Sequence, residues 1–220
     1  MYQNIRTVKN DGLLNISTLS SGNWYKVLVE NNITMDTDDQ GRQTLKPCRA
    51  ETSHPEVDWE LTWRLATLKG LSSEDHSFLW KMLHNLLPTQ ERLHRLGMQN
   101  TPTPNCTQCD LAVPDQLPHA LLTCPQNTEV TEWLFQVLNP IMPGISPQQL
   151  VLLCLGNTQE DQELPLVWLI SQTLNNIWTQ RSQHKKPSLY QTRALLEAGI
   201  SIMRKTRYEE CCALLEMIIA

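Results

Sequence analysis

The feature that most constrains this chain is a series of four potential metal ligands, Cys106, Cys109, His119 and Cys124, in a Cys-x2-Cys-x9-His-x4-Cys order. Zn²⁺ takes thiolate and imidazole ligands tetrahedrally, and a gap of two residues lets both sulfurs of a tight turn face one point. Prolines between the two pairs favour a turn that brings the second pair back to the first. The pattern therefore predicts one zinc ion that staples a loop.

Two other interpretations of these cysteines are open: unpaired buried thiols, or disulfides of a secreted chain. The sequence contains seven cysteines, an odd number, and Cys154 lies in an apolar run that is typical of a core. The first residues are polar and do not look like a secretory or mitochondrial leader. These observations favour zinc, and they predict an intracellular protein of the nucleus or the cytoplasm.

A metal site with four protein ligands has no open position, so we expect a structural zinc rather than a catalytic one. Structural zinc contributes about 10–16 kcal/mol of apparent binding energy in small zinc modules, which exceeds the stability of an ordinary domain. Loss of one ligand should therefore unfold the module. Three thiolates around a divalent cation carry one net negative charge, so any contact with nucleic acid needs cations from neighbouring residues.

The net charge of −5 over 220 residues argues against a protein devoted to coating phosphate backbones. Basic residues nevertheless gather between positions 180 and 207, where Glu197 is the single acid. This stretch has two interpretations, a nucleic-acid surface or a solvated helix face. No apolar run reaches the length of a membrane span, so we expect no membrane contact.

Apolar residues recur at helical spacing through most of the chain, and no strand pattern is convincing. The expected fold class is all-α, a bundle-like array of helices with a small zinc-stapled loop module. We expect three regions: an N-terminal segment with a polar linker (1–56), a helical zinc-binding module (57–135) and a C-terminal helical region (136–220).

Individual helices are bounded by caps and breakers. Ser72 or Ser73 with Asp75 predicts a capping-box start for a helix that ends at Pro88, and Thr89 caps the next helix, which closes at Gly97. The other expected elements are a short helix at 23–30, a linker at 34–55, helices at 57–68, 128–138 and 148–155, a polar loop at 156–163 and a helix at 164–183.

The last predicted helix is long. It begins after Ser188 and extends for up to about 30 residues, with Leu195, Ile202, Leu214, Leu215 and Ile218 pointing inward. Gly199 within it indicates a kink or a close contact with another helix.

The chemistry of an enzyme is missing from the sequence. We find no phosphate-binding glycine loop, no metalloprotease motif and no serine nucleophile elbow. Asp38 and Asp39 are the one adjacent acidic pair that resembles a two-metal site, but they lie in the polar linker without apolar neighbours. We therefore expect no catalytic residues and no small-molecule substrate.

A family resemblance follows from the segment around the cysteines. The segment begins with Phe78-Leu-Trp-Lys-Met-Leu-His-Asn-Leu-Leu-Pro-Thr89, continues with Arg92-Leu93 and Gly97, and ends with the Cys/His series and Trp133. It resembles the zinc-binding region after the reverse transcriptase of non-LTR (LINE-type) retrotransposons. The resemblance is best from about Trp59 to Trp133.

The resemblance implies a C-terminal segment of a retrotransposon polyprotein that helps to hold template RNA and target DNA during target-primed reverse transcription. This sequence lacks the polymerase Ala-Asp-Asp motif and the endonuclease residues of that family, so the expected segment is not an enzyme. A truncated element copy and a host-retained fragment are both consistent with it.

Two functions follow as hypotheses. The first is binding of RNA or DNA, with phosphates contacted by one or both of two sets of basic residues: Lys81, Arg92 and Arg95, and Arg181, Lys185 and Lys186. Trp80 is expected to be a core residue, with stacking on a base as the alternative. His84 and His94 resemble ligands, but the metal already has four better-spaced partners, so we expect an orienting or packing histidine and a solvent-facing one. The second hypothesis is a protein-interaction module whose C-terminal helices dock on a partner or on a second copy.

Overall fold

The computed structural model describes residues 35–37, 43–45, 53–98, 101–155, 159–205 and 208–219. The chain divides into two compact units, residues 1–48 and 49–220, each of which is described by itself. The helix expected at 23–30 and the acidic pair Asp38 and Asp39 lie outside the described residues.

In the first unit, the described residues form two short antiparallel strands, β1 (Met35–Thr37) and β2 (Gln43–Leu45). Met35 pairs with Leu45, and Thr37 pairs with Gln43. The expectation of a linker without strands over 34–55 was therefore wrong in this part. Strands of three residues are too short to produce an alternating pattern that the sequence could reveal.

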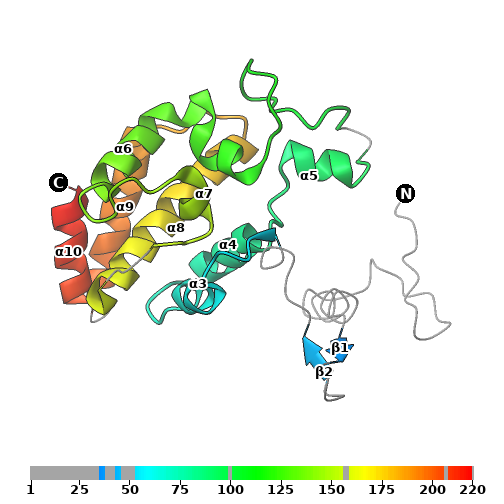
Figure 1. Ribbon diagram of the computed structural model, residues 1–220. Helices are drawn as coiled ribbons and strands as arrows, with labels where there is room; N and C mark the ends of the chain where they lie inside the picture. Colours follow the sequence, from blue (N-terminus) through cyan, green and yellow to red (C-terminus); the bar gives the residue numbers. More distant parts are fainter. Residues whose placement is uncertain are drawn as a thin grey trace, which may run out of the picture. The chain divides into compact units, whose positions relative to one another are not determined.

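The second unit is helical, which confirms the all-α prediction for the body of the chain (Figure 1). Its elements are α3 (Trp59–Ala66), α4 (Ser73–Leu83), α5 (Gln90–Arg95), the π-helix η2 (His119–Thr123), the 3-10 helix η3 (Pro125–Asn127), α6 (Thr128–Leu138), α7 (Pro147–Val151), α8 (Glu160–Ser182), α9 (Leu189–Arg204) and α10 (Glu209–Ile219).

Helix α8 is the centre of this unit. It contacts α3, α4, η2, α9 and α10, so segments from both ends of the unit pack on it (Figure 1). Its apolar side chains are buried on several faces, as expected for a helix that neighbours surround. The fully buried members are Leu166, Val167, Leu169, Ile170, Leu174 and Ile177.

The start of α4 forms as the sequence predicts. Ser72 accepts a hydrogen bond from the backbone of Asp75, whose carboxylate accepts one from the backbone of Ser72, so the capping box is complete. One oxygen of Asp75 also accepts hydrogen bonds from Ser171 (2.8 Å) and Gln172 (2.6 Å) of α8. Asp75 is 1% exposed, and it joins the start of α4 to the central helix.

Two helix boundaries differ from the prediction. Helix α8 begins at Glu160, inside the segment expected to be a polar loop, and Pro165 lies within it rather than in its first turn. The single long C-terminal helix is two helices, α9 and α10. They pack on each other and on α8, which gives α10 a buried face that a continuation of α9 would not have.

The division into α9 and α10 changes which C-terminal side chains are internal. Leu215 is fully buried, but Leu195 and Ile202 are 41% and 64% exposed, which corrects the prediction that both point inward. Gly199 makes a close contact rather than a kink: a Cβ atom there would lie 2.6 Å from Cζ2 of Trp168. The glycine lets α9 approach the tryptophan of α8.

Within the part of the chain that the structure describes, none of the helices has both the length and the apolar character that crossing a membrane requires.

Candidate metal centre

The four residues of the Cys/His series come together at one point of the second unit. Their ligand atoms, the sulfurs of Cys106, Cys109 and Cys124 and a ring nitrogen of His119, all lie within 4.8 Å of one another. Cys106 and Cys124 are buried, and Cys109 is half-buried. The arrangement can hold one metal ion.

The spacing of two pairs of ligand atoms is close to that of tetrahedral zinc. With Zn–S and Zn–N bonds of about 2.3 and 2.05 Å, ideal tetrahedral geometry places two sulfurs about 3.8 Å apart and a sulfur and a nitrogen about 3.6 Å apart. The observed distances are 4.0 Å between the sulfurs of Cys106 and Cys124, and 3.5 Å from the sulfur of Cys109 to Nε2 of His119. The six described cysteines form no disulfide, which disfavours the disulfide interpretation for them.

The first ligand pair sits in a small hairpin. The backbone of Cys106 donates to the carbonyl of Val113 (2.8 Å), and that of Asp115 donates to the carbonyl of Pro104 (2.9 Å). These two bonds close the loop that contains the Cys-x2-Cys turn. Inside the turn, the backbone N–H of Gln108 points at the sulfur of Cys106 (3.4 Å), so the turn itself stabilises negative charge on that sulfur.

The second ligand pair spans a π-helical turn. The carbonyl of His119 accepts a hydrogen bond from the backbone of Cys124 (2.9 Å), which places the two ends of the x4 spacing side by side. Ala120 and Leu121 between them are fully buried and anchor the turn in the core. The amide of Asn127, itself 1% exposed, holds the turn by donating to the carbonyl of Ala120 (2.9 Å). A π-turn at a functional site is a recurrent use of this geometry.

The imidazole of His119 is oriented for ligation through Nε2. Its other nitrogen, Nδ1, lies 3.4 Å from the hydroxyl of Thr123. With a metal on Nε2, Nδ1 carries the proton and donates to this hydroxyl, which is the type of contact that fixes ligand histidines elsewhere. Burial lowers the pKa of His119. The charge of Asp115 raises this pKa and that of Arg181 lowers it, and the net shift is downward, so the neutral imidazole that a metal needs is favoured.

The buried side chain of Arg181 lies against the cluster. Its guanidinium donates to the sulfur of Cys106 (3.3 Å), to the sulfur of Cys124 (3.8 Å) and to the carboxylate of Asp115. Arg181 is 7% exposed, so it is not available to contact phosphates, which corrects its place among the expected nucleic-acid contacts. The sequence signal that could have revealed it is a lone arginine at the end of a helix whose residues from 164 to 180 are all uncharged.

The environment separates the pKa values of two cluster cysteines. Burial raises the pKa of Cys124 to about 11. Burial also acts to raise the pKa of Cys106, but the hydrogen bonds from Arg181 and Gln108, together with the guanidinium charge, outweigh it and lower that pKa. A metal that binds here therefore displaces a proton more easily from Cys106 than from Cys124.

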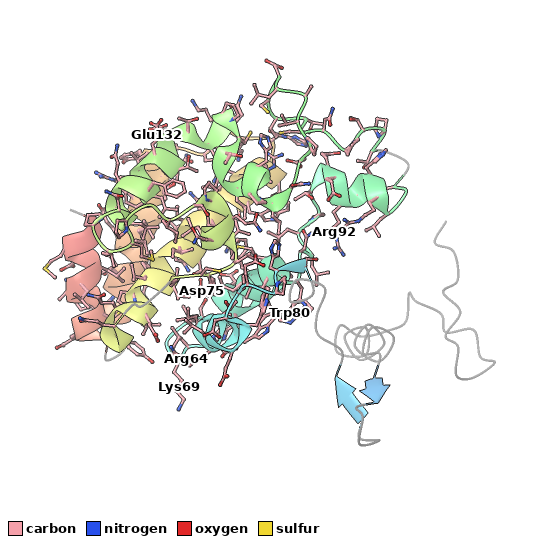
Figure 2. The ribbon with its side chains drawn as sticks, viewed as in Figure 1. Arg64, Lys69, Asp75, Trp80, Arg92 and Glu132 are labelled. Carbon is pink, nitrogen blue, oxygen red and sulfur yellow. The ribbon has the colours of Figure 1, made fainter. Side chains whose placement is uncertain are left out.

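Other candidate residues lie outside the cluster. His84 stacks between Trp63 and Trp80, with ring centroids 5.0 and 4.6 Å away, so it is a packing histidine. His94 is exposed, and its ring contacts the carbonyl of Thr101 (3.0 Å). Trp80 is 39% exposed, which corrects the expectation of a core residue. Its ring forms part of the surface of α4 (Figure 2).

The remaining basic candidates fall into two places. Lys81 and Arg95 are exposed on α4 and α5, and Arg95 pairs with Glu91 (3.2 Å). The guanidinium of Arg92 donates to the carbonyl of Asn85, so it holds the turn between these helices (Figure 2). Lys185 and Lys186 are exposed just beyond α8, next to His184.

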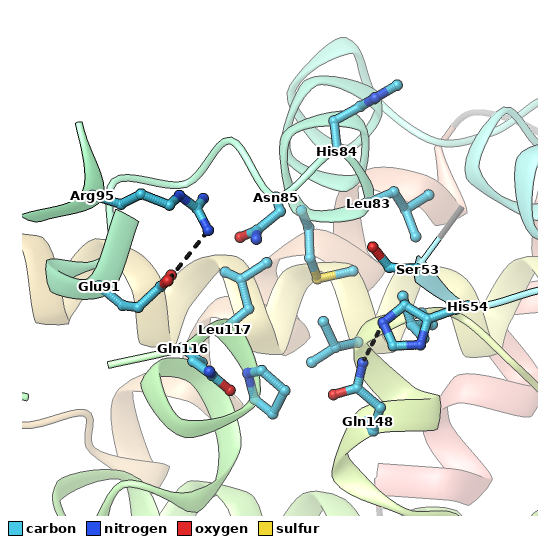
Figure 3. A pocket seen from close by; sticks show the side chains of 14 residues that line it. Ser53, His54, Leu83, His84, Asn85, Glu91, Arg95, Gln116, Leu117 and Gln148 are labelled. Carbon is cyan, nitrogen blue, oxygen red and sulfur yellow. Dashed lines mark hydrogen bonds and ion pairs between the residues drawn. The ribbon is translucent and has the colours of Figure 1, made fainter. Parts of the chain in front are cut away.

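A pocket of about 290 Å³ opens beside the α4–α5 connection. Figure 3 shows the Arg95–Glu91 pair at one end and the contact between His54 and Gln148 at the other. Asn85 and Gln116 add amide groups to its lining, and Leu117 and Val151 are among its apolar residues. Ser53 and His54 also line it, and the two ring nitrogens of His54 contact Glu56 (3.3 Å) and Gln148 (3.4 Å).

Comparison with protein families adds one decisive observation. Residues 47–130 match a family described as zinc-binding in reverse transcriptase, and all four cluster residues lie inside the match. This segment is similar to that family. The comparisons with curated proteins and with solved structures found no match.

The zinc-binding-in-reverse-transcriptase segment begins in the first unit and ends in α6, and it therefore leaves α7 to α10 outside the match. The family resemblance stated from the sequence is confirmed for these residues. The family description names zinc binding in reverse transcriptase, and the match covers a zinc-binding domain.

Proposed function

We propose that this chain is a non-catalytic zinc-binding module that assists the binding of RNA or DNA during target-primed reverse transcription. The observation that supports it is the set of four ligand atoms within 4.8 Å of one another, inside the segment that matches the zinc-binding-in-reverse-transcriptase family. Cys106, Cys109, His119 and Cys124 would hold the ion. Zinc would supply no reaction step there, because the protein fills all four positions of a tetrahedral site.

Metal content tests the first half of this proposal. Purified protein is expected to contain one equivalent of zinc, and Cys106→Ser is expected to lose it. Cys154→Ser is the matched control, because Cys154 lies outside the cluster and should leave the zinc in place. Purified protein that contains no zinc, or a Cys106→Ser variant that keeps a full equivalent, would contradict the proposal.

The α4–α5 surface is the proposed place for nucleic acid. Lys81 and Arg95 supply exposed cations, and the partly exposed ring of Trp80 offers a face on which an unpaired base can stack. Lys185 and Lys186 form a second exposed set. The loop that contains Cys106 and Cys109 lies beside this second set, because its Gln108 contacts His184 (3.0 Å), the residue before Lys185.

Salt dependence of binding tests this half. Each phosphate neutralised on a single strand contributes about 0.7 to the slope of log affinity against log salt. Combined replacement of Lys81 and Arg95 by Gln should therefore reduce the slope by about 1.4. Combined replacement of Lys185 and Lys186 by Gln should reduce it by the same amount if the bound strand reaches these residues. Lys69→Gln, an exposed lysine after α3, controls for net charge. Salt-insensitive binding, or no binding, by the zinc-loaded protein would contradict a nucleic-acid role.

A second candidate function is a protein-interaction module. The observation that favours it is the exposure of large apolar side chains on the last two helices: Ile202 is 64% exposed, and Met217 is 71% exposed. Under this function the helices dock on a partner or on a second copy. Sedimentation of the purified chain distinguishes docking on a second copy from docking on another partner. A dimer that Ile202→Asp dissociates would support self-association. A monomer would leave this surface to another partner or to solvent.

A further inference from the structure

Arg181 is one of two charged side chains that the core holds beside the proposed metal centre. It is 7% exposed, and its partner Asp115 is 1% exposed. Burial of an arginine costs free energy unless its donors are satisfied, and here they bond two sulfurs and a carboxylate. Arg181 lies on α8, outside the family match over 47–130.

The electrostatics explain why a cation is placed here. Three thiolates and one divalent ion carry a net negative charge in a buried site, and N–H donors to thiolate sulfur stabilise that charge. The guanidinium supplies such donors to Cys106 and Cys124 together, and it adds a positive charge. The backbone N–H of Gln108 is the other donor that the described residues direct at Cys106.

The geometry requires the planar guanidinium rather than any cation. Nη1 faces the sulfur of Cys124, and Nη2 faces both the sulfur of Cys106 and Asp115. The second oxygen of Asp115 accepts from the backbone N–H of Gln90 (2.9 Å), so the carboxylate is itself fixed. A lysine ammonium is a point charge on a flexible stem and cannot span these three partners in the same way.

We infer that Arg181, held by Asp115, is a positioning residue of the metal centre that strengthens metal binding and joins the zinc loop to the end of α8. The inference rests on the metal binding proposed above. The same end of α8 makes a second contact with the loop, through His184 and Gln108. Because α9 and α10 pack on α8, metal occupancy is then coupled to the packing of the C-terminal helices.

Zinc affinity measured by competition with a chelator is the first test. Loss of an outer partner of metal ligands usually weakens binding about 10- to 100-fold, and we expect this range for Arg181→Gln and a similar loss for Asp115→Asn. Lys186→Gln is the matched control, because it removes the positive charge of an exposed side chain that is not part of the cluster. It should bind zinc as the wild type does.

A spectroscopic readout separates positioning from general stability. In the cobalt-substituted protein, thiolate-to-metal charge-transfer bands report on the sulfurs, and they should shift in Arg181→Gln but not in Lys186→Gln. Arg181→Lys keeps the positive charge but lacks the planar guanidinium. It should therefore have a zinc affinity between those of Arg181→Gln and the wild type, with charge-transfer bands that still differ from those of the wild type. In the wild-type chain, the guanidinium resonances of Arg181 should shift and gain protection from solvent exchange when zinc is added.

The outcomes are distinguishable. If the wild type binds no zinc, the proposed metal binding fails, and the inference fails with it. If the wild type binds zinc but Arg181→Gln and Asp115→Asn bind it equally well with unchanged cobalt bands, only the inference is overturned. If Arg181→Gln does not fold, Arg181→Lys, Asp115→Asn and the wild-type resonances decide between these results.

Discussion

Glu163 accepts two hydrogen bonds from the guanidinium of Arg64, each 2.6 Å long. The pair joins α3, which lies inside the family match, to α8, which lies outside it. The side chain of Glu163 is 5% exposed, whereas that of Arg64 is 49% exposed. The two partners therefore differ in what is left behind when one is removed.

We expect Arg64→Gln to be more destabilising than Glu163→Gln. The first change leaves a buried carboxylate without its cation and should cost about 2–3 kcal/mol, whereas the second leaves an arginine that water can reach and should cost about 1 kcal/mol. Urea unfolding of the zinc-loaded protein measures both. The double variant should cost less than the sum of the two. Equal losses for the two single variants would contradict this ranking.

Asp75 gives a comparison between two capping boxes. The box of α4 is buried and also bonds Ser171 and Gln172, whereas the box of α7, formed by Ser146 and Gln149, is exposed. Asp75→Ala should cost about 3 kcal/mol, because it removes the buried acceptor that the backbone of Ser72 and the side chains of Ser171 and Gln172 share. Gln149→Ala should cost about 1 kcal/mol. Similar values for both would show that the bonds to α8 contribute little.

These contacts also show what the sequence could predict. The start of α4 and the spacing of the Cys/His series depend on neighbours within a few residues, so the sequence contains their signals. The approach of Arg181 to Cys106 joins residues 75 positions apart, and no local pattern encodes it. The division between α9 and α10 was missed because both carry the same helical periodicity, and periodicity does not say where a chain turns back.

Partial exposure was equally hidden. Trp80 repeats with the apolar residues of α4, so its pattern predicts burial, yet its ring rests on His84 at the surface. In the same way, Leu195 and Ile202 follow the helical spacing of α9 and remain exposed. An amphipathic pattern indicates which face of a helix is apolar, but it does not say how much of that face another element covers.

Gly199 is expected to resist substitution by alanine. In an ordinary helix, Gly→Ala stabilises by about 1 kcal/mol. Here the new Cβ atom would lie 2.6 Å from the ring of Trp168, which is itself buried, and overpacking of this kind typically costs about 1–3 kcal/mol. We therefore expect a net loss of stability on thermal unfolding.

Gly97→Ala is the control for Gly199. Gly97 has a φ of +69° and nothing within 4 Å of the added atom, so its alanine variant reports backbone strain without a clash. Trp168→Phe should relieve part of the loss in Gly199→Ala and none in Gly97→Ala. Stabilisation by Gly199→Ala would mean that α9 and α8 are further apart than the structure places them.

Zinc removal is expected to reverse how stability depends on pH. Zinc needs thiolates, and burial raises the pKa of Cys124 to about 11, so zinc binding releases a proton from this residue at neutral pH. Protons compete increasingly with the metal as the pH falls. Zinc affinity should therefore fall by up to about tenfold per pH unit for each proton released. Because bound zinc stabilises the fold, the zinc-loaded protein should lose stability when the pH drops from 8 towards 6.

In the metal-free protein, the contribution of Cys124 to stability should decrease as the pH rises, rather than as it falls. The folded pKa of about 11 lies above the unfolded value of 9.0, so the protonated thiol stabilises the fold below pH 9, and this contribution is lost as the pH rises through 11. Thermal unfolding with and without a chelator measures both slopes. Metal-free Cys124→Ser, which has no thiol to titrate at this position, should lose the alkaline component that the metal-free wild type shows. If the chelator leaves the slope between pH 6 and 8 unchanged, the four ligand atoms do not hold a metal that stabilises the fold.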